Sequence, residues 1–479
     1  MKKVGKAAKL AIIILIFLCF ADYFLKHYDT KEYGPEQMDL YVEKMCEIAD
    51  VPGMSMVIFN DNQESYLNVG YADKSTKTEA SGDTQYELAS ATKAFTALGI
   101  LLLEQNDALD REDPVNRYLP WFALVYKGKK ADVTIEQLLC HTSGIPAWTI
   151  SVLPVGTEND GGLLEKTVRA VRNVELDHLP GTVHSYATIN YDILALIMEQ
   201  ITGIAYEEYI KQNVLEPLGM TNSYFRVDNS KTAQLAQGYR YVLMRAAKYD
   251  APAFYGNTAA GYLVSNTKDL RIWLKAQMGM FEADMTEPLE KLKTAIAESH
   301  SYPIETKQNY WAGWNIYDGY ICHSGNNPNF SSQVIIDTDE SKAVFAVANV
   351  CGAAVTATAD GVYRMIHGES VKIGLYLDMV SMLDFIGFIL CLIELYAGIC
   401  ILKKRENAGK HALMKAAGAL LLAMIVVAFP YILHYNYLTL AVWYSPCLRI
   451  AIWGAFICLS GYAGTHIKNH IRIQRSGKK

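Results

Sequence analysis

The hydroxyl of Ser90 and the amine of Lys93 could form a nucleophile and its base, because the two residues are three positions apart at the start of an apolar run. Leu98, Leu101 and Leu102 follow at helical spacing, which predicts a helix with Ser90 in its first turn. The first backbone N–H groups of a helix are unpaired and lie at the positive end of its dipole. Side chains three residues apart share one face, so the Lys93 amine can reach the Ser90 hydroxyl. A basic group beside a hydroxyl is what nucleophilic catalysis by serine requires.

Two further copies of the Ser-x-x-Lys spacing show that the tetrapeptide alone is a weak signal. Residues 265–268 open an amphipathic run, where Ser265 or Asn266 suits the N-cap of a helix. Residues 476–479 belong to a basic tail. The assignment of Ser90 as a nucleophile therefore depends on what else the chain supplies.

The 479-residue chain is acidic in its middle and basic at its ends, although its formal net charge is only −6. Residues 27–371 hold 45 Asp and Glu against 27 Lys and Arg, whereas the flanks hold 5 against 17. An acidic body argues against nucleic acid as a partner.

The N-terminus is typical of an export signal. Four lysines within the first nine residues precede an apolar stretch at residues 10–21. This stretch is short for a spanning helix and suits the hydrophobic region of a secretory signal. Cleavage after Ala21 and retention as an anchor both stay open, so residues 1–25 are interpreted as a signal peptide or an N-terminal anchor. In either case we expect the acidic body to be exported.

Three further apolar segments lie near the C-terminus, at residues 385–402, 416–438 and 440–465. Lysines and arginines gather between the first two segments and after the last, whereas the Tyr-rich turn at 434–437 has neither. By the positive-inside rule, the basic loops are cytoplasmic and the Tyr-rich turn is outside.

We therefore expect three transmembrane helices within residues 380–465 and a basic cytoplasmic tail at 466–479, with membrane lipid as a partner. Glu394 and Arg449 fall inside these spans, and because charges within a membrane usually face a partner, these two could pair. Their depths do not obviously match, so a plain role in helix contact is the favoured interpretation.

The nine cysteines are an odd number, and five of them lie in apolar segments. Cys140-His141 and Cys322-His323 lack the Cys-x-x-Cys or His-Glu-x-x-His spacing of a zinc site. We expect no disulfide framework, no metal site and no cofactor.

Strand patterns occur at both ends of the exported body, and residues 92–300 between them are mostly helical in pattern. Two hairpins are expected, the second with the favoured Asp318-Gly319 turn. The expected strands are 53–59, 66–70, 311–317, 320–323, 333–337 and 343–348. This order predicts an α+β fold, with an antiparallel sheet closed by sequence-distant segments, flanked by helices and joined to a helical subdomain.

Several motifs together resemble the serine beta-lactamase and penicillin-binding protein superfamily. The similarity covers residues 38–368 and is closest to the branch of class C beta-lactamases, D-alanyl-D-alanine carboxypeptidases and related esterases. We assign the hydrolase domain to residues 31–370. Besides Ser90-Ala91-Thr92-Lys93, the matching motifs are Leu109-Asp110-Arg111-Glu112-Asp113-Pro114, Leu138-Leu139-Cys140-His141-Thr142-Ser143-Gly144, Glu216-Pro217-Leu218-Gly219-Met220 and Ala259-Ala260-Gly261-Tyr262.

The resemblance implies roles for the remaining site residues. Tyr186 matches the tyrosine of the family's Tyr-x-Asn motif, and His323-Ser324-Gly325 matches its Lys/His-x-Gly strand. A nearby Lys93 ammonium would lower the pKa of the Tyr186 phenol, so that the two together take the Ser90 proton. The oxyanion hole would use the backbone N–H groups of Ser90 and Asn326.

Two departures from the family pattern concern substrate recognition. Thr188 stands where the family has Asn, so a hydroxyl replaces the carboxamide that binds the substrate's amide. His323 replaces Lys, as in the carboxypeptidase and aminopeptidase members, and would orient or neutralise the substrate together with Ser324 and Gly325. The combination of an export signal, a hydrolase body and three spans resembles the membrane-bound D-amino peptidases.

These features predict a serine hydrolase at the outer face of the plasma membrane that acts through an acyl-enzyme. The leading interpretation is a peptidase that cleaves amides beside D-amino acids in a cell-wall peptide or a peptide prodrug. An esterase or beta-lactamase of the same fold and a non-hydrolytic penicillin-binding sensor stay open as alternatives. The expected partner is a small peptide or amide substrate, and the oligomeric state is left open.

Overall fold

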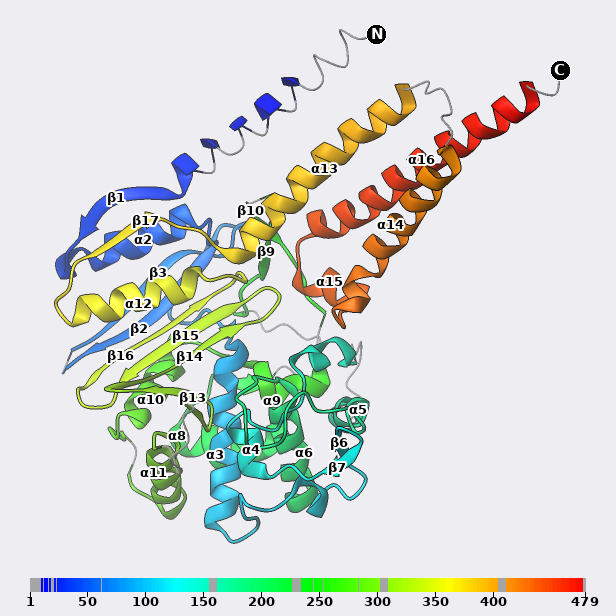
Figure 1. The fold of residues 1–479 in the computed structure, drawn as a ribbon. Helices are drawn as coiled ribbons and strands as arrows, with labels where there is room; N and C mark the ends of the chain where they lie inside the picture. The colour runs from blue at the N-terminus through cyan, green and yellow to red at the C-terminus, as the bar shows by residue number, and fades with distance from the viewer. Residues whose placement is uncertain are drawn as a thin grey trace. The chain divides into compact units, whose positions relative to one another are not determined.

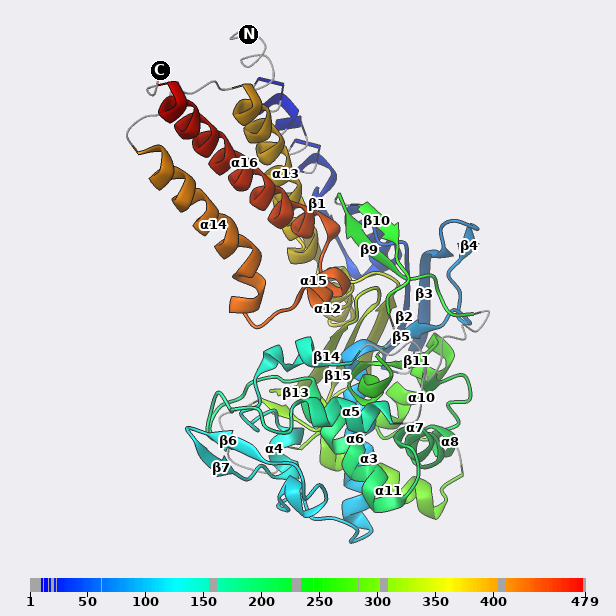
Figure 2. The ribbon, with the colours of Figure 1, turned by 90° about the vertical axis from the view of Figure 1, so that its right-hand side faces the viewer.

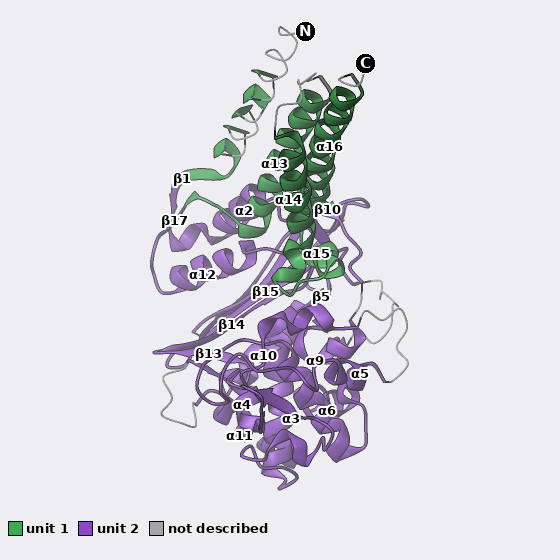
Figure 3. Cartoon of the chain, turned by 45° about the vertical axis from the view of Figure 1, so that its right-hand side comes forward, with its two compact units in different colours: residues 1–30, 241–247, 374–479 green, residues 31–240, 248–373 purple. Residues whose placement is uncertain are grey.

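The computed structural model describes the chain apart from residues 1–9, 12, 16, 19–20, 23, 62, 155–161, 226–233, 244, 253, 283, 302–308, 404–410 and 477–479. The described residues form two compact units, coloured separately in Figure 3. Unit 2 comprises residues 31–240 and 248–373, and unit 1 comprises residues 1–30, 241–247 and 374–479.

An eight-stranded sheet is the centre of unit 2 (Figure 1). Its order is β12-β13-β14-β15-β16-β2-β3-β4, and neighbouring strands pair antiparallel. The two expected hairpins are confirmed as β2–β3 and β13–β14. Sequence-distant strands close the sheet, because β16 pairs with β2 from Lys342 opposite Asn60 to Ala348 opposite Met54. The structure thus confirms the expected antiparallel α+β architecture.

Helices cover both faces of this sheet. On one face, α12 packs against β15, β16 and α2. The hydroxyl of Tyr41 in α2 donates to the carbonyl of Ala357 in α12 over 3.1 Å. A side chain at Gly361 would collide with Tyr41, so glycine permits this close crossing. The other face receives α10 and the turn η2, and Figure 2 shows the helical layer beneath the sheet.

The helix α3 is the central element of that helical layer. It packs against α6, α9 and α11, and every residue from Thr92 to Leu103 is buried. A helix surrounded on all sides must be apolar all round, which explains the run of leucines that predicted it. A buried lysine in such a helix is therefore an exception, and Lys93 is that residue.

Unit 1 contains three helices that are long and apolar enough to cross a membrane among the described residues. These candidate spans are Met379–Ile401, Ala412–Ile432 and Pro446–Arg475, with mean hydropathies of 2.1, 2.3 and 1.4. The expected second and third segments are shifted, because α14 ends at Ile432 and a separate short helix, α15, precedes α16. The Asn436 side chain caps α15 by accepting from the Thr439 N–H (2.8 Å), and Pro446 opens α16.

The suggested pairing of Glu394 with Arg449 is wrong. The Glu394 carboxylate packs against Gly454 of α16, where a side chain would collide with it. Among the described residues, no ion pair joins Glu394 to Arg449. Glycine at position 454 lets α16 approach α13 closely enough to cover the acid. Glu394 therefore has a structural role in the contact between α13 and α16.

The strands are β1 (Tyr28–Tyr33), β2 (Gly53–Asn60), β3 (Gln63–Asp73), β4 (Thr78–Glu79), β5 (Tyr86–Glu87), β6 (Leu124–Tyr126), β7 (Lys129–Ala131), β8 (Tyr224–Phe225), β9 (Tyr239–Val242), β10 (Arg245–Lys248), β11 (Leu263–Ser265), β12 (Tyr310–Trp311), β13 (Trp314–Tyr317), β14 (Tyr320–Asn326), β15 (Ser331–Asp337), β16 (Lys342–Ala348) and β17 (Val371–Leu375). The α-helices are α2 (Met38–Ile48), α3 (Thr92–Gln105), α4 (Ile135–Leu139), α5 (Leu163–Ala170), α6 (Ile189–Thr202), α7 (Tyr206–Ile210), α8 (Glu216–Leu218), α9 (Thr258–Gly261), α10 (Thr267–Gln277), α11 (Glu287–Ser299), α12 (Ala354–Ile366), α13 (Met379–Lys403), α14 (Ala412–Ile432), α15 (Tyr437–Trp443) and α16 (Pro446–Ser476). Shorter turns are η1 (Pro35–Gln37), η2 (Ala89–Ala91), η3 (Val115–Arg117), η4 (Ala147–Val152), η5 (Lys211–Leu215) and η6 (Tyr255–Asn257).

Candidate active site

Ser90 lies in the turn η2, which continues directly into α3. Ala89 before it has a left-handed φ of +47°, so the backbone turns sharply just ahead of the serine. Strand β14 passes so close that a side chain at Gly325 would come within 2.8 Å of the Ser90 nitrogen. Only glycine fits there, which explains the third position of the His-Ser-Gly motif. Ser90 itself keeps intermediate exposure and can meet a substrate.

Lys93 is fully buried beneath Ser90. Its Nζ lies 3.2 Å from the Ser90 Oγ and donates to the carbonyl of Ala260 over 2.6 Å. Burial lowers the pKa of the Lys93 amine to about 7, and the Asp192 carboxylate opposes this shift. A substantial fraction of Lys93 is therefore unprotonated near neutral pH, and the free amine can accept the Ser90 proton.

The second Ser-x-x-Lys site, at residues 265–268, lacks this arrangement. Asn266 caps α10 by accepting from the Asp269 N–H (3.1 Å), as the sequence suggested. Lys268 forms an exposed ion pair with Asp83, and the Ser265 hydroxyl is bonded to Ser223. The third site ends in residues 477–479, which lie outside the described residues.

Tyr186 lies beside Lys93 just before α6. The Lys93 Nζ is 5.1 Å from the centroid of the Tyr186 ring, and the tyrosine hydroxyl is buried. The Tyr186 hydroxyl has no hydrogen-bond partner of ordinary geometry among the described residues. The Ser90 hydroxyl is nevertheless near enough to lower the pKa of the Tyr186 phenol. Burial raises the pKa of the Tyr186 phenol, and this outweighs the opposing effect of Ser90. The expectation of a lowered phenol pKa is wrong, because a buried phenolate loses its hydration.

His141 holds the segment that carries Tyr186. Its ring centroid is 4.1 Å from that of Tyr186, and its Nδ1 accepts from the Asn190 amide (3.0 Å) and the Ala187 N–H (3.4 Å). The Asn190 oxygen in turn accepts from Ser143 over 3.0 Å. Because Nδ1 of His141 accepts both hydrogen bonds, the proton of the neutral ring is on Nε2. The Leu-Leu-x-His-Thr-Ser-Gly motif thus orients the start of α6.

His323 is neutral and fully engaged. Its Nδ1 lies 2.6 Å from the Ser324 carbonyl, which can only accept, so Nε2 accepts from the Tyr310 hydroxyl at 3.0 Å. Burial lowers the pKa of His323 to about 3, and the Lys93 charge adds to this effect. Without a bound anion, His323 is therefore uncharged near neutral pH. This state favours orientation of the substrate over neutralisation, and both roles stay predictions.

The remaining predicted residues, Thr188, Ser324 and Asn326, lie on the two segments that carry Tyr186 and His323. Along β14, His323 and Gly325 are buried whereas Ser324 and Asn326 are exposed, as strand alternation requires. The Asn326 side chain accepts from the Gly352 N–H over 3.2 Å. Thr188 precedes α6 with intermediate exposure. Proximity of β14 to Ser90 is compatible with an oxyanion hole made by Ser90 and Asn326, which stays a prediction.

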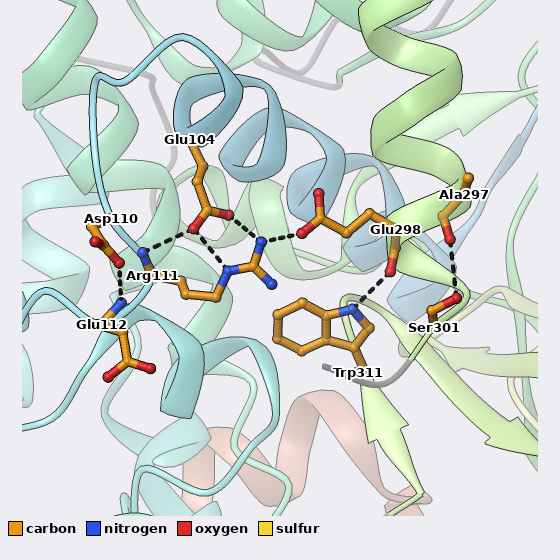
Figure 4. Close-up of polar contacts among 8 residues, drawn as sticks. All are labelled: Glu104, Asp110, Arg111, Glu112, Ala297, Glu298, Ser301 and Trp311. Carbon is orange, nitrogen blue, oxygen red and sulfur yellow. Dashed lines mark hydrogen bonds and ion pairs between the residues drawn. The ribbon is translucent and has the colours of Figure 1, made fainter. Parts of the chain in front are cut away.

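A charged cluster supports the strand that carries Tyr310 (Figure 4). The Arg111 guanidinium binds Glu104 through its Nε (2.8 Å), also pairs with Glu298, and lies 5.3 Å from the Trp311 ring centroid. The Trp311 indole N–H donates to the Glu298 carbonyl over 3.2 Å. Trp311 follows Tyr310 directly, so this cluster fixes the position of β12.

The structure thus brings Ser90, Lys93, Tyr186, His323 and Gly325 together from four separate elements. Sequence reasoning missed Asp192, Tyr310 and the charged partners of Arg111. An acid in the mostly apolar first half of α6 was the available signal for Asp192. Glu298 lies 187 residues from Arg111, and nothing in the sequence linked them.

Residues 39–368 match the family model described as Beta-lactamase. Protein flp of Staphylococcus aureus strain MRSA252 is 29% identical over 452 residues, which cover 88% of each chain. For Protein flp of strain N315 the identity is 34% over 325 residues, and the alignment spans 63% of the relative's length.

Solved structures show the same fold. The octameric penicillin-binding protein homologue from Pyrococcus abyssi is 26% identical with a TM-score of 0.59, covering 70% of this chain and 77% of its own. A class C beta-lactamase is 17% identical with a TM-score of 0.58, covering 69% of this chain and 95% of its own. At that identity the second likeness concerns the fold alone.

Proposed function

Because this chain belongs to the beta-lactamase family of serine hydrolases, we propose that it is a membrane-bound peptidase that cleaves amides beside D-amino acids. The proposal assigns Ser90 as the nucleophile of an acyl-enzyme mechanism. The observation that carries it is the buried Lys93 amine, with a pKa of about 7, held 3.2 Å from the partly exposed Ser90 hydroxyl.

Acylation starts with transfer of the Ser90 proton to Lys93. The Ser90 Oγ attacks the substrate carbonyl, and the N–H groups of Ser90 and Asn326 stabilise the oxyanion. As the carbon–nitrogen bond breaks, the leaving nitrogen takes a proton from Tyr186, whose raised pKa keeps it a neutral phenol and hence a donor. The Lys93 ammonium then returns a proton to the phenolate, and the product amine leaves.

Deacylation reverses the proton path. Water adds to the ester carbonyl and gives a proton to the Lys93 amine. The carbon–Oγ bond breaks, the acid product leaves, and the proton returns to Ser90. Thus Lys93 accepts a proton in both half-reactions, and Tyr186 serves the leaving group.

Substrate choice is the finer part of the proposal. The resemblance of residues 38–368 to the carboxypeptidase branch supports an amide beside a D-residue, such as a cell-wall peptide or a peptide prodrug. An esterase is the second candidate, because the neutral His323 and the short Thr188 hydroxyl both suit an acyl group without a charged neighbour. Amide and ester analogues with the same acyl part would separate these two functions.

The proposed location is the outer face of the plasma membrane. Its support is the uneven Lys and Arg content around the three candidate spans. In a cysteine-free background, we expect a cysteine at the exposed position 268 of the hydrolase body to react with a membrane-impermeant reagent in intact cells, and one at position 404 to react only after permeabilisation. Reaction at position 404 in intact cells would overturn this topology.

Covalent labelling tests the assignment of the nucleophile. A fluorophosphonate probe should label the full-length protein at Ser90, as identified by peptide mass analysis, and Ser90→Ala should abolish the labelling. Ser265→Ala is the matched control, because it alters the second Ser-x-x-Lys site and should leave labelling intact. Undiminished labelling of Ser90→Ala would refute the proposal.

A further inference from the structure

Asp192 is a buried acid that the mechanism above does not use. It lies in α6, its residue is 0% exposed, and neither carboxyl oxygen has a hydrogen-bond partner among the described residues. Most other buried residues of α6 are apolar. A carboxyl group is costly to bury without a partner, so its position calls for an explanation.

The charged group that acts on Asp192 is Lys93. The helices α3 and α6 pack together, and the Lys93 Nζ is 5.7 Å from the ring centroid of Tyr191, the residue before Asp192. One turn along α3, Thr96 bonds the Tyr206 hydroxyl (2.7 Å), and the charge of Asp192 acts on Tyr206 as well. Asp192 is therefore buried within electrostatic range of both the Lys93 and the Tyr206 side chains.

We propose that Asp192 is a positioning residue: its carboxylate is the buried counter-charge of Lys93 and, through it, controls how readily Ser90 gives up its proton. Asp192 does not touch the substrate. Its effect is electrostatic, because opposite charges attract strongly where little water screens them. This inference rests on the proposed acylation at Ser90.

The electrostatics of both groups support this relation. Burial lowers the pKa of Lys93 to about 7, and Asp192 opposes that fall. Burial raises the pKa of Asp192, and Lys93 opposes that rise. Each group thus favours the charged form of the other, and the two titrate as a pair.

Other titratable groups around the pair are neutral near pH 7 or bonded elsewhere. Burial raises the pKa of Tyr186, Tyr191 and Tyr206 and lowers that of His141 and His323, which keeps all five uncharged. Glu207 of α7 is bonded to the Thr258 hydroxyl over 2.6 Å. Asp192 is the acid whose charge acts on Lys93 among the described residues.

The proton balance of acylation shows when this counter-charge acts. The Ser90 proton moves to the Lys93 Nζ, so a neutral amine becomes an ammonium while the new bond to Oγ forms. The carboxylate stabilises that ammonium without itself receiving the proton. A pre-placed charge that stabilises what develops in the transition state lowers the barrier.

The test is the pH dependence of fluorophosphonate labelling of Ser90 in the full-length protein, comparing wild type with Asp192→Asn. The variant keeps the shape of the side chain and removes its charge. Because an anion no longer favours the ammonium, the pKa of Lys93 should fall. The acid limb of the rate profile should then move to lower pH by about one unit, and the plateau rate should drop about tenfold.

Two further variants keep the test decisive. Asp192→Ser removes the charge with less volume and should shift the limb in the same direction, whereas Asp192→Glu should return it toward the wild-type position. Glu207→Gln is the matched control, since it neutralises a buried acid bonded to Thr258 and should leave the limb in place.

The possible failures are distinguishable. Wild-type protein that is not labelled at Ser90 would refute the proposed function. Normal wild-type labelling with an unshifted limb in Asp192→Asn would refute the role of Asp192 alone, because the carboxyl would then be uncharged where Lys93 titrates. If both uncharged variants are recovered only unfolded, Asp192 is a folding residue and the inference fails.

Discussion

The Asn190 amide donates to Nδ1 of His141 across 3.0 Å, and its oxygen accepts from Ser143, so this carboxamide is fully engaged inside the fold. Asn190 is buried and two residues beyond Thr188, where the family has its substrate-binding Asn. It therefore cannot replace the missing group. Position 188 offers a substrate only a hydroxyl.

Thr188→Asn should consequently change selectivity more than chemistry. Restoring a carboxamide should raise kcat/KM for a D-alanyl dipeptide mimic or a chromogenic cephalosporin by about tenfold or more, because a hydrogen-bonding site discriminates strongly by its partner. Fluorophosphonate labelling of Ser90 should stay within about threefold of wild type. Equal specificity constants for both proteins on both substrates would show that residue 188 does not set selectivity.

The pH dependence of acylation follows from Lys93. As a base, the amine must be unprotonated, so the labelling rate of Ser90 should rise with pH through about 7 and then level off. Lys93→Met should reduce the plateau by about a hundredfold or more. Lys268→Met is the control, since this exposed lysine pairs with Asp83. A rate that is independent of pH between about 5 and 9 would exclude Lys93 as the base.

Tyr186→Phe should separate the two proton transfers. A fluorophosphonate expels fluoride, which needs no proton, so labelling of Ser90 should change little. Hydrolysis of an amide substrate needs a protonated leaving nitrogen and should fall by about a hundredfold. Stopped-flow labelling and amide turnover measured on the same preparation would compare them. Equal losses in both assays would instead make Tyr186 part of the base.

Arg111 should matter for stability rather than for proton transfer. Arg111→Met leaves Glu104 and Glu298 facing each other without their shared cation, so thermal unfolding of the hydrolase unit should begin about 3–6 °C lower. Arg117→Met is the matched control, because the Arg117 side chain is largely exposed and its pair with Asp113 should contribute little. The acid limb of Ser90 labelling should stay at the wild-type pH in both variants.

Much of this architecture could be predicted because it depends on local patterns. The helix around Lys93, the hairpin at Asp318-Gly319 and the three apolar segments follow from spacing, turn chemistry and hydropathy. The exact ends of the second and third spans could not, since the Asn436 cap starts a separate short helix, α15, where the two expected spans adjoin.

The sequence by itself determined which residues could react and the family order in which they occur, because Ser90, Lys93, Tyr186 and His323 are identified by type and spacing. Only the tertiary structure decided their protonation states. Burial, and not the neighbouring ammonium, governs the pKa of the Tyr186 phenol, and it leaves His323 neutral. Asp192 and Lys93 are 99 positions apart in the numbering, and only the packing of α6 on α3 makes them a pair. Desolvation depends on everything that surrounds a group in space, and local sequence does not contain that information.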